Sequence, residues 1–167
     1  MKSLGRWISD TLLERGVLEH AMSRRDYKMR VSGQVNNIIE NWCMIRLARK
    51  TGHPTLVRCI DHWKDELLTA MSAGVTVMVK SGDKRNMLDD VIEMHFGDIR
   101  KGNDPREARE NVSKIMKVKM RKEKIISPDI IRDLPGIIND FINEIYIIFN
   151  KIKSDDPDTI ADYVDGL

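Results

Sequence analysis

The stretch "RLARKTGHPTLVRCIDHW", residues 46–63, concentrates basic and imidazole side chains that could act on a phosphate group. Arginine and lysine stabilise negative charge, and histidine can move protons near neutral pH. The candidate phosphate-binding residues of this stretch are Arg46, Arg49, Lys50 and Arg58. His53 stands between Gly52 and Pro54, a context that favours a turn as much as a reactive site.

An arginine followed about five to seven residues later by a histidine is the kernel of the motif of the HEPN ribonucleases. Arg46 and His53 have this spacing, as do Arg15 and His20. The resemblance implies metal-independent RNA cleavage by an all-α dimer, with Arg46 and His53 as catalytic residues. Because about one such pair is expected by chance in a chain with this many arginines, ribonuclease activity is the alternative function here.

A second basic run, "KIMKVKMRKEK", covers residues 114–124. Its candidate nucleic-acid ligands are Lys114, Lys117, Lys119, Arg121 and Lys122. Charge is segregated along the chain, since residues 98–124 carry ten basic and five acidic groups and residues 125–167 carry three and nine. Flexible cations of this kind suit phosphate contacts. We therefore predict a non-enzymatic interaction or regulatory protein that contacts nucleic acid, or a nucleoprotein partner, through basic patches.

Metal and cofactor chemistry find little support in the sequence. The acidic and imidazole groups around residues 61–66 stand at the spacing of surface ion pairs on a helix, and no Glu-x-x-His pair occurs. Cys43 and Cys59 lack the paired spacing of zinc ligands and are too few for a disulfide framework. There is no glycine-rich phosphate loop. We expect no metal site and no cofactor.

The elements that must position these residues are helices, because apolar side chains recur at steps of three and four. We expect an all-α, single-domain antiparallel bundle of about five to seven helices. The expected helices cover residues 3–20, 31–51, 54–74, 83–97, 104–124 and 136–153. Breaks are predicted at Gly52–Pro54 and at Pro135–Gly136. The β-like run 75–79 is interpreted as a buried connection or a helix extension.

The bundle is expected to cover residues 1–153, followed by an acidic tail, 154–167, with about one helical turn and partial mobility. The apolar stripe of 136–153 is wide enough to be central in the core or to form an interface with a protein partner or a second copy. We favour the core and keep a homodimer as the alternative. Met78, Met87, Met94, Met116 and Met120 are expected on an adaptable surface.

The length and composition of the chain are consistent with a single globular domain. A chain of 167 residues with 41% apolar and 32% charged residues is long enough to bury one core. No apolar segment of about 20 residues is present. We therefore expect a cytoplasmic protein that does not span a membrane.

Overall fold

The computed structural model describes residues 4, 24–80, 92–93, 96, 105–154 and 156–167. These parts of the chain contain no strand, so the predicted all-α fold is confirmed. The described helices are α2 (Arg24–Thr51), α3 (Pro54–Val57), α4 (Ile60–Lys80), α6 (Arg106–Lys122), α7 (Pro128–Lys153) and α8 (Pro157–Asp165). None of them is long and apolar enough to cross a membrane. The helix expected over 3–20, most of that expected over 83–97, and Arg15, His20, Met87 and Met94 lie outside the described residues.

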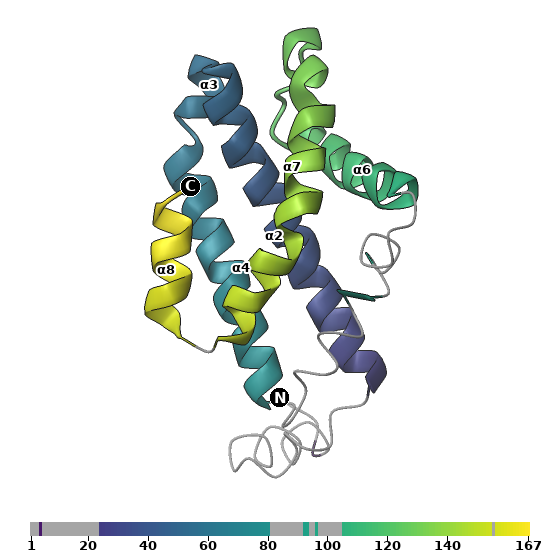
Figure 1. Cartoon of the computed structure of the whole chain (residues 1–167), viewed down its shortest axis with the longest axis vertical. Helices are drawn as coiled ribbons and strands as arrows, with labels where there is room; N and C mark the ends of the chain where they lie inside the picture. The colour runs from purple at the N-terminus through teal and green to yellow at the C-terminus, as the bar shows by residue number, and fades with distance from the viewer. Residues whose placement is uncertain (1–3, 5–23, 81–91, 94–95, 97–104, 155) are drawn as a thin grey trace.

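The predicted break after α2 is confirmed. Gly52 has a φ of +61°, a left-handed conformation that glycine adopts without a steric penalty. Pro54 then stands in the first turn of the short helix α3. After α3 the chain returns beside α2 as α4, and these two helices make the most extensive contact in the bundle (Figure 1). The run 75–79 extends α4 to Lys80, one of the two interpretations that we gave it.

Two helix boundaries differ from our prediction. Helix α2 begins at Arg24, before the apolar pattern that starts at Val31. Helix α7 continues through Pro135, where we predicted a break. The proline removes one helical hydrogen bond, but Leu134, Ile137 and Ile138 are buried on either side of it. Burial of this apolar face compensates for the lost bond, so the break is absent.

The core is continuous across α2, α4, α6, α7 and α8. Trp42 of α2 is fully buried and lies edge-on to Phe141 of α7, with ring centroids 5.4 Å apart. The wide apolar stripe of α7 is covered by the other helices of the same chain, which is the core arrangement. Met116 and Met120 of α6 are also buried, so the expectation that they lie on the surface was wrong.

The C-terminal segment is part of the bundle and contains more helix than the single turn that we expected. Helix α8 packs against α4 and α7, and Ile160, Val164 and Leu167 are buried. Its Tyr163 hydroxyl accepts a hydrogen bond from Trp42 Nε1 at 3.0 Å. Burial raises the pKa of Tyr163 to about 12, so this hydroxyl stays protonated.

Gly33 lies inside α2, and Gly52 follows its last residue. Substituting each by alanine gives a matched test of the helix break at Gly52. We expect Gly52→Ala to lower the free energy of unfolding by about 1 kcal/mol, because the left-handed conformation strains a Cβ atom. Gly33→Ala should instead raise it by about 0.5 kcal/mol, since alanine favours a helix interior and the new Cβ meets no atom within 4 Å. Urea unfolding followed by circular dichroism measures both. Equal effects would contradict the assigned turn.

A second test concerns the docking of α8. Tyr163→Phe leaves the buried indole N–H of Trp42 without its acceptor and should cost about 1–3 kcal/mol of stability. The exposed neighbour Asp162→Asn should change stability by less than about 0.5 kcal/mol. Thermal unfolding compares the two variants. A neutral Tyr163→Phe would show that α8 is not held by this hydrogen bond.

Candidate functional site

The candidate nucleic-acid ligands on α6 occupy two different environments. Lys114, Lys117 and Arg121 are exposed and stand three and four residues apart, so they share one face of the helix. We call these three residues the α6 basic face. Val118, 58% exposed, lies beside them. Within the described part of the chain none of the three forms an ion pair, and all three side chains are exposed to solvent.

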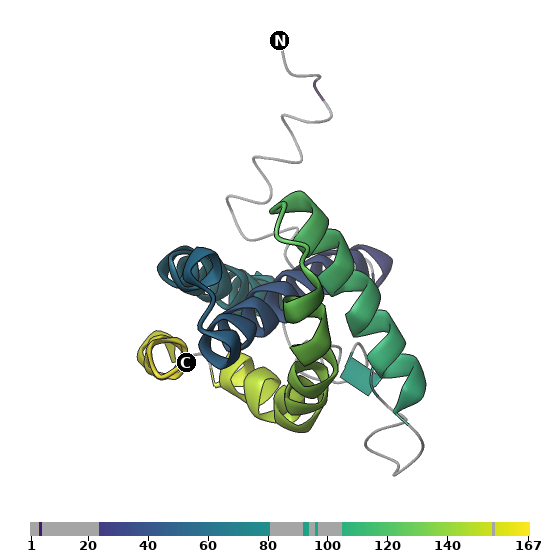
Figure 2. The ribbon, with the colours of Figure 1, turned by 90° about the horizontal axis from the view of Figure 1, so that it is seen from above.

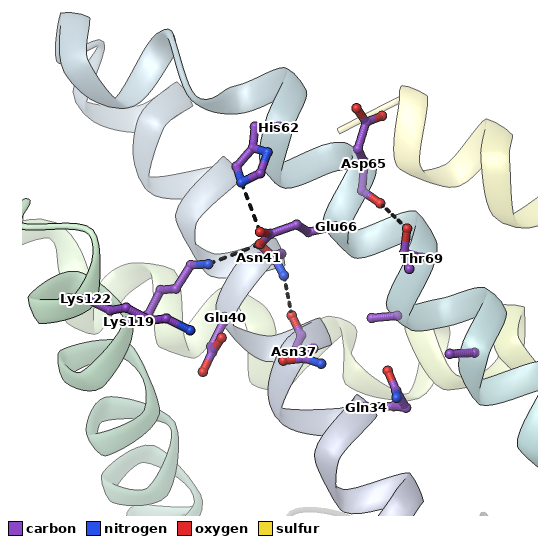
Figure 3. A pocket seen from close by; sticks show the side chains of 12 residues that line it. Gln34, Asn37, Glu40, Asn41, His62, Asp65, Glu66, Thr69, Lys119 and Lys122 are labelled. Carbon is purple, nitrogen blue, oxygen red and sulfur yellow. Dashed lines mark hydrogen bonds and ion pairs between the residues drawn. The ribbon is translucent and has the colours of Figure 1, made fainter. Parts of the chain in front are cut away.

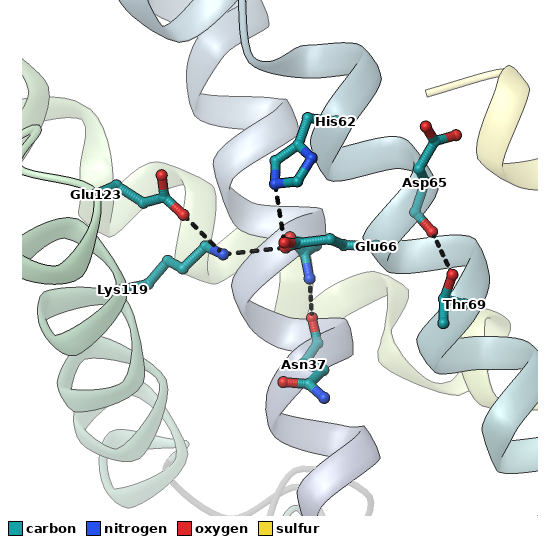
Figure 4. Close-up of polar contacts among 8 residues, drawn as sticks. Asn37, His62, Asp65, Glu66, Thr69, Lys119 and Glu123 are labelled. Carbon is teal, nitrogen blue, oxygen red and sulfur yellow. Dashed lines mark hydrogen bonds and ion pairs between the residues drawn. The ribbon is translucent and has the colours of Figure 1, made fainter.

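Lys119 lies on the other side of α6 and is only 5% exposed. Its Nζ is 3.1 Å from Glu66 Oε2 and 3.2 Å from Glu123 Oε1 (Figure 4). Burial on its own lowers the pKa of Lys119, but the hydrogen bonds to the two carboxylates outweigh burial and raise it. The amine is therefore charged and already partnered inside the protein. Lys122 is exposed at the edge between this side and the α6 basic face.

Arg46 is engaged within the bundle. Its Nη2 lies 3.1 Å from Glu144 Oε1 of α7, and its guanidinium stands over the Trp42 ring, 5.1 Å from the centroid. The hydroxyl of Tyr163 lies 3.5 Å from the other oxygen of Glu144. These contacts tie α2 to α7 and α8. A structural role thus accounts for Arg46, and its role as a phosphate ligand stays a prediction.

The remaining basic residues of the opening stretch lie at the end of the bundle formed by the α2–α3–α4 connection. Arg49, Lys50 and Arg58 are exposed there. The Nζ of Lys50 lies over α7, 2.9 Å from the position that a Cβ on Gly136 would take. The absence of a side chain at Gly136 therefore leaves room for this amine between α2 and α7.

His53 is exposed and precedes α3, where its side chain makes no capping hydrogen bond. No contact between the side chains of Arg46 and His53 occurs in the structure as described. A catalytic pair needs both groups available to a substrate, whereas Arg46 is held by Glu144. The predicted ribonuclease pair gains no geometric support within one copy of the chain.

A polar groove of about 500 Å³ lies between α2, α4 and α6, and our sequence analysis missed it (Figure 3). Helix α2 lines it with Gln34, Asn37, Glu40 and Asn41. Gln34 and Asn37 are three residues apart, and Asn37 is followed by Glu40 and Asn41 at steps of three and four, so the four side chains form one polar stripe next to the buried apolar stripe. That spacing was visible in the sequence, but it is equally typical of a solvent-exposed helix face.

The opposite walls of the groove are held together by a charged network. In Glu66 of α4, Oε1 lies 2.9 Å from His62 Nε2, and Oε2 pairs with Lys119 Nζ (Figure 4). Glu123 binds the same lysine from within α6. Both oxygens of Glu66 are thus occupied, and the network fixes α6 against α4.

Glu40 and Asn41 each place an acceptor in the groove that has no hydrogen-bond partner among the described residues. The Nδ2 of Asn41 donates to the Asn37 carbonyl at 2.8 Å, whereas its Oδ1 is buried and has no hydrogen-bond partner in the described chain. Glu40 is half-buried, and burial raises its pKa despite the opposing charges of Lys119 and Lys122. Glu66 and Glu123 contribute further to the increase.

Metal ligation is not supported by these residues. No group of three or more His, Cys, Asp or Glu side chains in the described residues is arranged to hold a metal ion. Cys43 and Cys59 are free thiols, and burial raises the pKa of Cys43 well above its ordinary value. A buried, protonated thiol is a poor nucleophile.

The pKa of Glu40 gives a test of the groove. A carboxyl group whose pKa is raised by folding destabilises the folded state above that pKa, and the penalty disappears at low pH. We expect Glu40→Gln to raise Tm at pH 7, with the gain shrinking as the pH falls through the raised pKa of Glu40 and disappearing below about 4.3, the ordinary glutamate pKa. Thermal unfolding across pH measures this. Glu107→Gln, at an exposed site of α6, is the control, and a lower Tm for Glu40→Gln would contradict the prediction.

Comparison with known proteins leaves the chain without a relative to guide the assignment. No family model matches it, and neither the curated proteins nor the solved structures contain a match.

Proposed function

We propose that this protein is a non-enzymatic helical binding protein that contacts the phosphate backbone of nucleic acid through the α6 basic face. The observation that carries the proposal is the row formed by Lys114, Lys117 and Arg121, exposed on one face of α6 and without an ion-pair partner among the described residues. Successive members stand about one helical turn, roughly 5.4 Å, apart. Three cations at this spacing can each approach a different phosphate of one backbone.

A simpler role for basic residues is stabilisation of a helix dipole, which favours cations in the last turn. That role suffices for Arg121, which lies in the last turn of α6. It does not account for Lys114 or Lys117, which precede the last turn, because the effect falls off within one turn of the helix end. Their exposure, without an ion-pair partner in the parts of the chain that the structure describes, therefore supports binding to an external anion.

The distribution of charge over the bundle also supports the approach of nucleic acid to the α6 side. Helix α8, which carries the exposed residues Asp158, Asp162 and Asp165, lies on the side of the bundle opposite to α6 (Figures 1 and 2). A polyanion is attracted to the α6 side and repelled from the α8 side. The acidic helix thus favours approach through the α6 basic face.

The chemistry of this face predicts binding without sequence preference. Its members are two lysines and one arginine, and the neighbouring exposed apolar residue is Val118. It carries no aromatic ring on which a base could stack. Phosphate contacts alone give affinity that depends strongly on salt and little on sequence.

Neutralising two of these cations tests the proposal. We expect the double variant Lys117→Gln/Arg121→Gln to weaken binding to labelled RNA and duplex DNA, and to reduce the slope of log K against log[salt] by about 2. Fluorescence anisotropy across a salt series measures both. The wild-type protein should leave the RNA intact.

The matched control removes two other exposed cations, at the C-terminal end of α2 and at the residue after α3, in Arg49→Gln/Arg58→Gln. Both are candidate phosphate ligands by sequence, so this control also tests whether binding resides on α6 rather than at the α2–α3–α4 connection. It has the same net charge as the test variant and should retain most of the wild-type affinity. Equal losses in the two variants would attribute binding to net charge rather than to the α6 basic face. Cleavage of the RNA would overturn the non-enzymatic assignment in favour of the ribonuclease alternative.

A further inference from the structure

The groove between α2, α4 and α6 has one wall that is rich in hydrogen-bond acceptors. This wall belongs to α2 and includes Asn37, Glu40 and Asn41. Asn41 is 2% exposed, and its amide lies at the centre of the lining side chains (Figure 3). Its orientation is set because Nδ2 donates to the Asn37 carbonyl at 2.8 Å. The amide oxygen is therefore the atom left for another donor.

Two acceptors of this wall have no donor in the described chain. Asn41 Oδ1 is buried and unpaired, and the carboxylate of Glu40 makes no hydrogen bond or ion pair within the described residues. An unpaired buried oxygen costs folding free energy, and so does a carboxylate partly removed from water. Both costs would be recovered by one incoming group that donates N–H bonds and carries positive charge.

The cations that line the groove in the described part of the chain do not fill this role. The amine of Lys119 is shared between Glu66 and Glu123, at 3.1 and 3.2 Å. Lys122 is exposed at the rim. The lining includes the carboxylates of Glu40, Asp65 and Glu66 against these two lysines and the imidazole of His62, which contacts Glu66. Glu123 takes up part of the charge of Lys119. The groove consequently favours a cation over an anion.

We propose that this groove binds a small organic cation of the primary alkylamine class, with its ammonium group placed between Glu40 and the Asn41 amide. Its volume of about 500 Å³ lies within the range of small-molecule sites, roughly 300–1,000 Å³. An ammonium group offers three N–H donors, which suits one amide oxygen and one carboxylate. No group of three or more His, Cys, Asp or Glu side chains among the described residues is arranged to hold a metal ion.

The shielding of Asn41 adds to the expected selectivity. A hydrogen bond in a site of low dielectric constant is stronger than the same bond at the surface. A ligand without a donor, such as a quaternary ammonium ion, would satisfy the charge of Glu40 and leave the Asn41 oxygen unpaired. We therefore expect a primary alkylamine to bind more tightly than its fully methylated analogue.

Calorimetric titration of the full chain with 1,4-diaminobutane tests the proposal. We expect saturable binding at one site, weakened about tenfold or more by Glu40→Gln, which removes the charged partner of the ammonium. Amide chemical shifts should change at Asn37, Asn41 and Glu66. The fully methylated diamine should bind more weakly.

Matched controls separate this site from other sources of attraction. Asp61→Asn removes an exposed carboxylate of α4 outside the groove and should leave the affinity unchanged. Lys117→Gln/Arg121→Gln should also leave it unchanged, so this proposal and nucleic-acid binding can fail separately. Absence of saturable diamine binding, an equal loss in Asp61→Asn, or displacement of the diamine by inorganic phosphate would each overturn the proposal.

Discussion

The burial of Trp42 is the constraint on which the arrangement of the helices depends. The indole has no exposed surface, yet its N–H requires an acceptor, which Tyr163 of α8 provides at 3.0 Å. Phe141 of α7 packs edge-on against the ring, and Arg46 covers it while pairing with Glu144. One side chain of α2 therefore fixes the positions of α7 and α8. The arginine that first suggested catalysis is part of this arrangement.

The position of α6 follows from a second, charged contact. Its apolar face packs on α2 and α7, and the salt bridge from Lys119 to Glu66 connects it to α4. Burying this lysine requires carboxylate partners, which Glu66 and Glu123 supply. The same packing leaves Lys114, Lys117 and Arg121 on the outside. It also places polar side chains of α2 along a groove. There Asn41 Oδ1 has no hydrogen-bond partner among the described residues, and burial raises the pKa of Glu40.

Local patterns in the sequence were sufficient for most of the fold. The alternation of apolar residues located the buried faces of α2 and α4, and Gly52 with Pro54 located the turn between them. Local rules failed where distant contacts outweighed them. Pro135 and Gly136 would end an isolated helix, but burial of Leu134, Ile137 and Ile138 maintains α7 through them. The acidic C-terminal segment folds as α8 because Tyr163 and Val164 meet partners far away in the sequence.

The sequence by itself determined the helical class, the buried stripes and the presence of a basic run at 114–124, because each of these depends on residue type and spacing along one helix. Only the tertiary structure decided which cations of that run face solvent and which is paired inside, and it alone brought Glu40, Asn41, Glu66 and Lys119 to one groove. The physical reason is that the spacing of residues along a helix defines its faces, but does not define which other helices pack against those faces. Whether a lysine is a surface charge or a buried partner depends on what the adjacent helix presents to it.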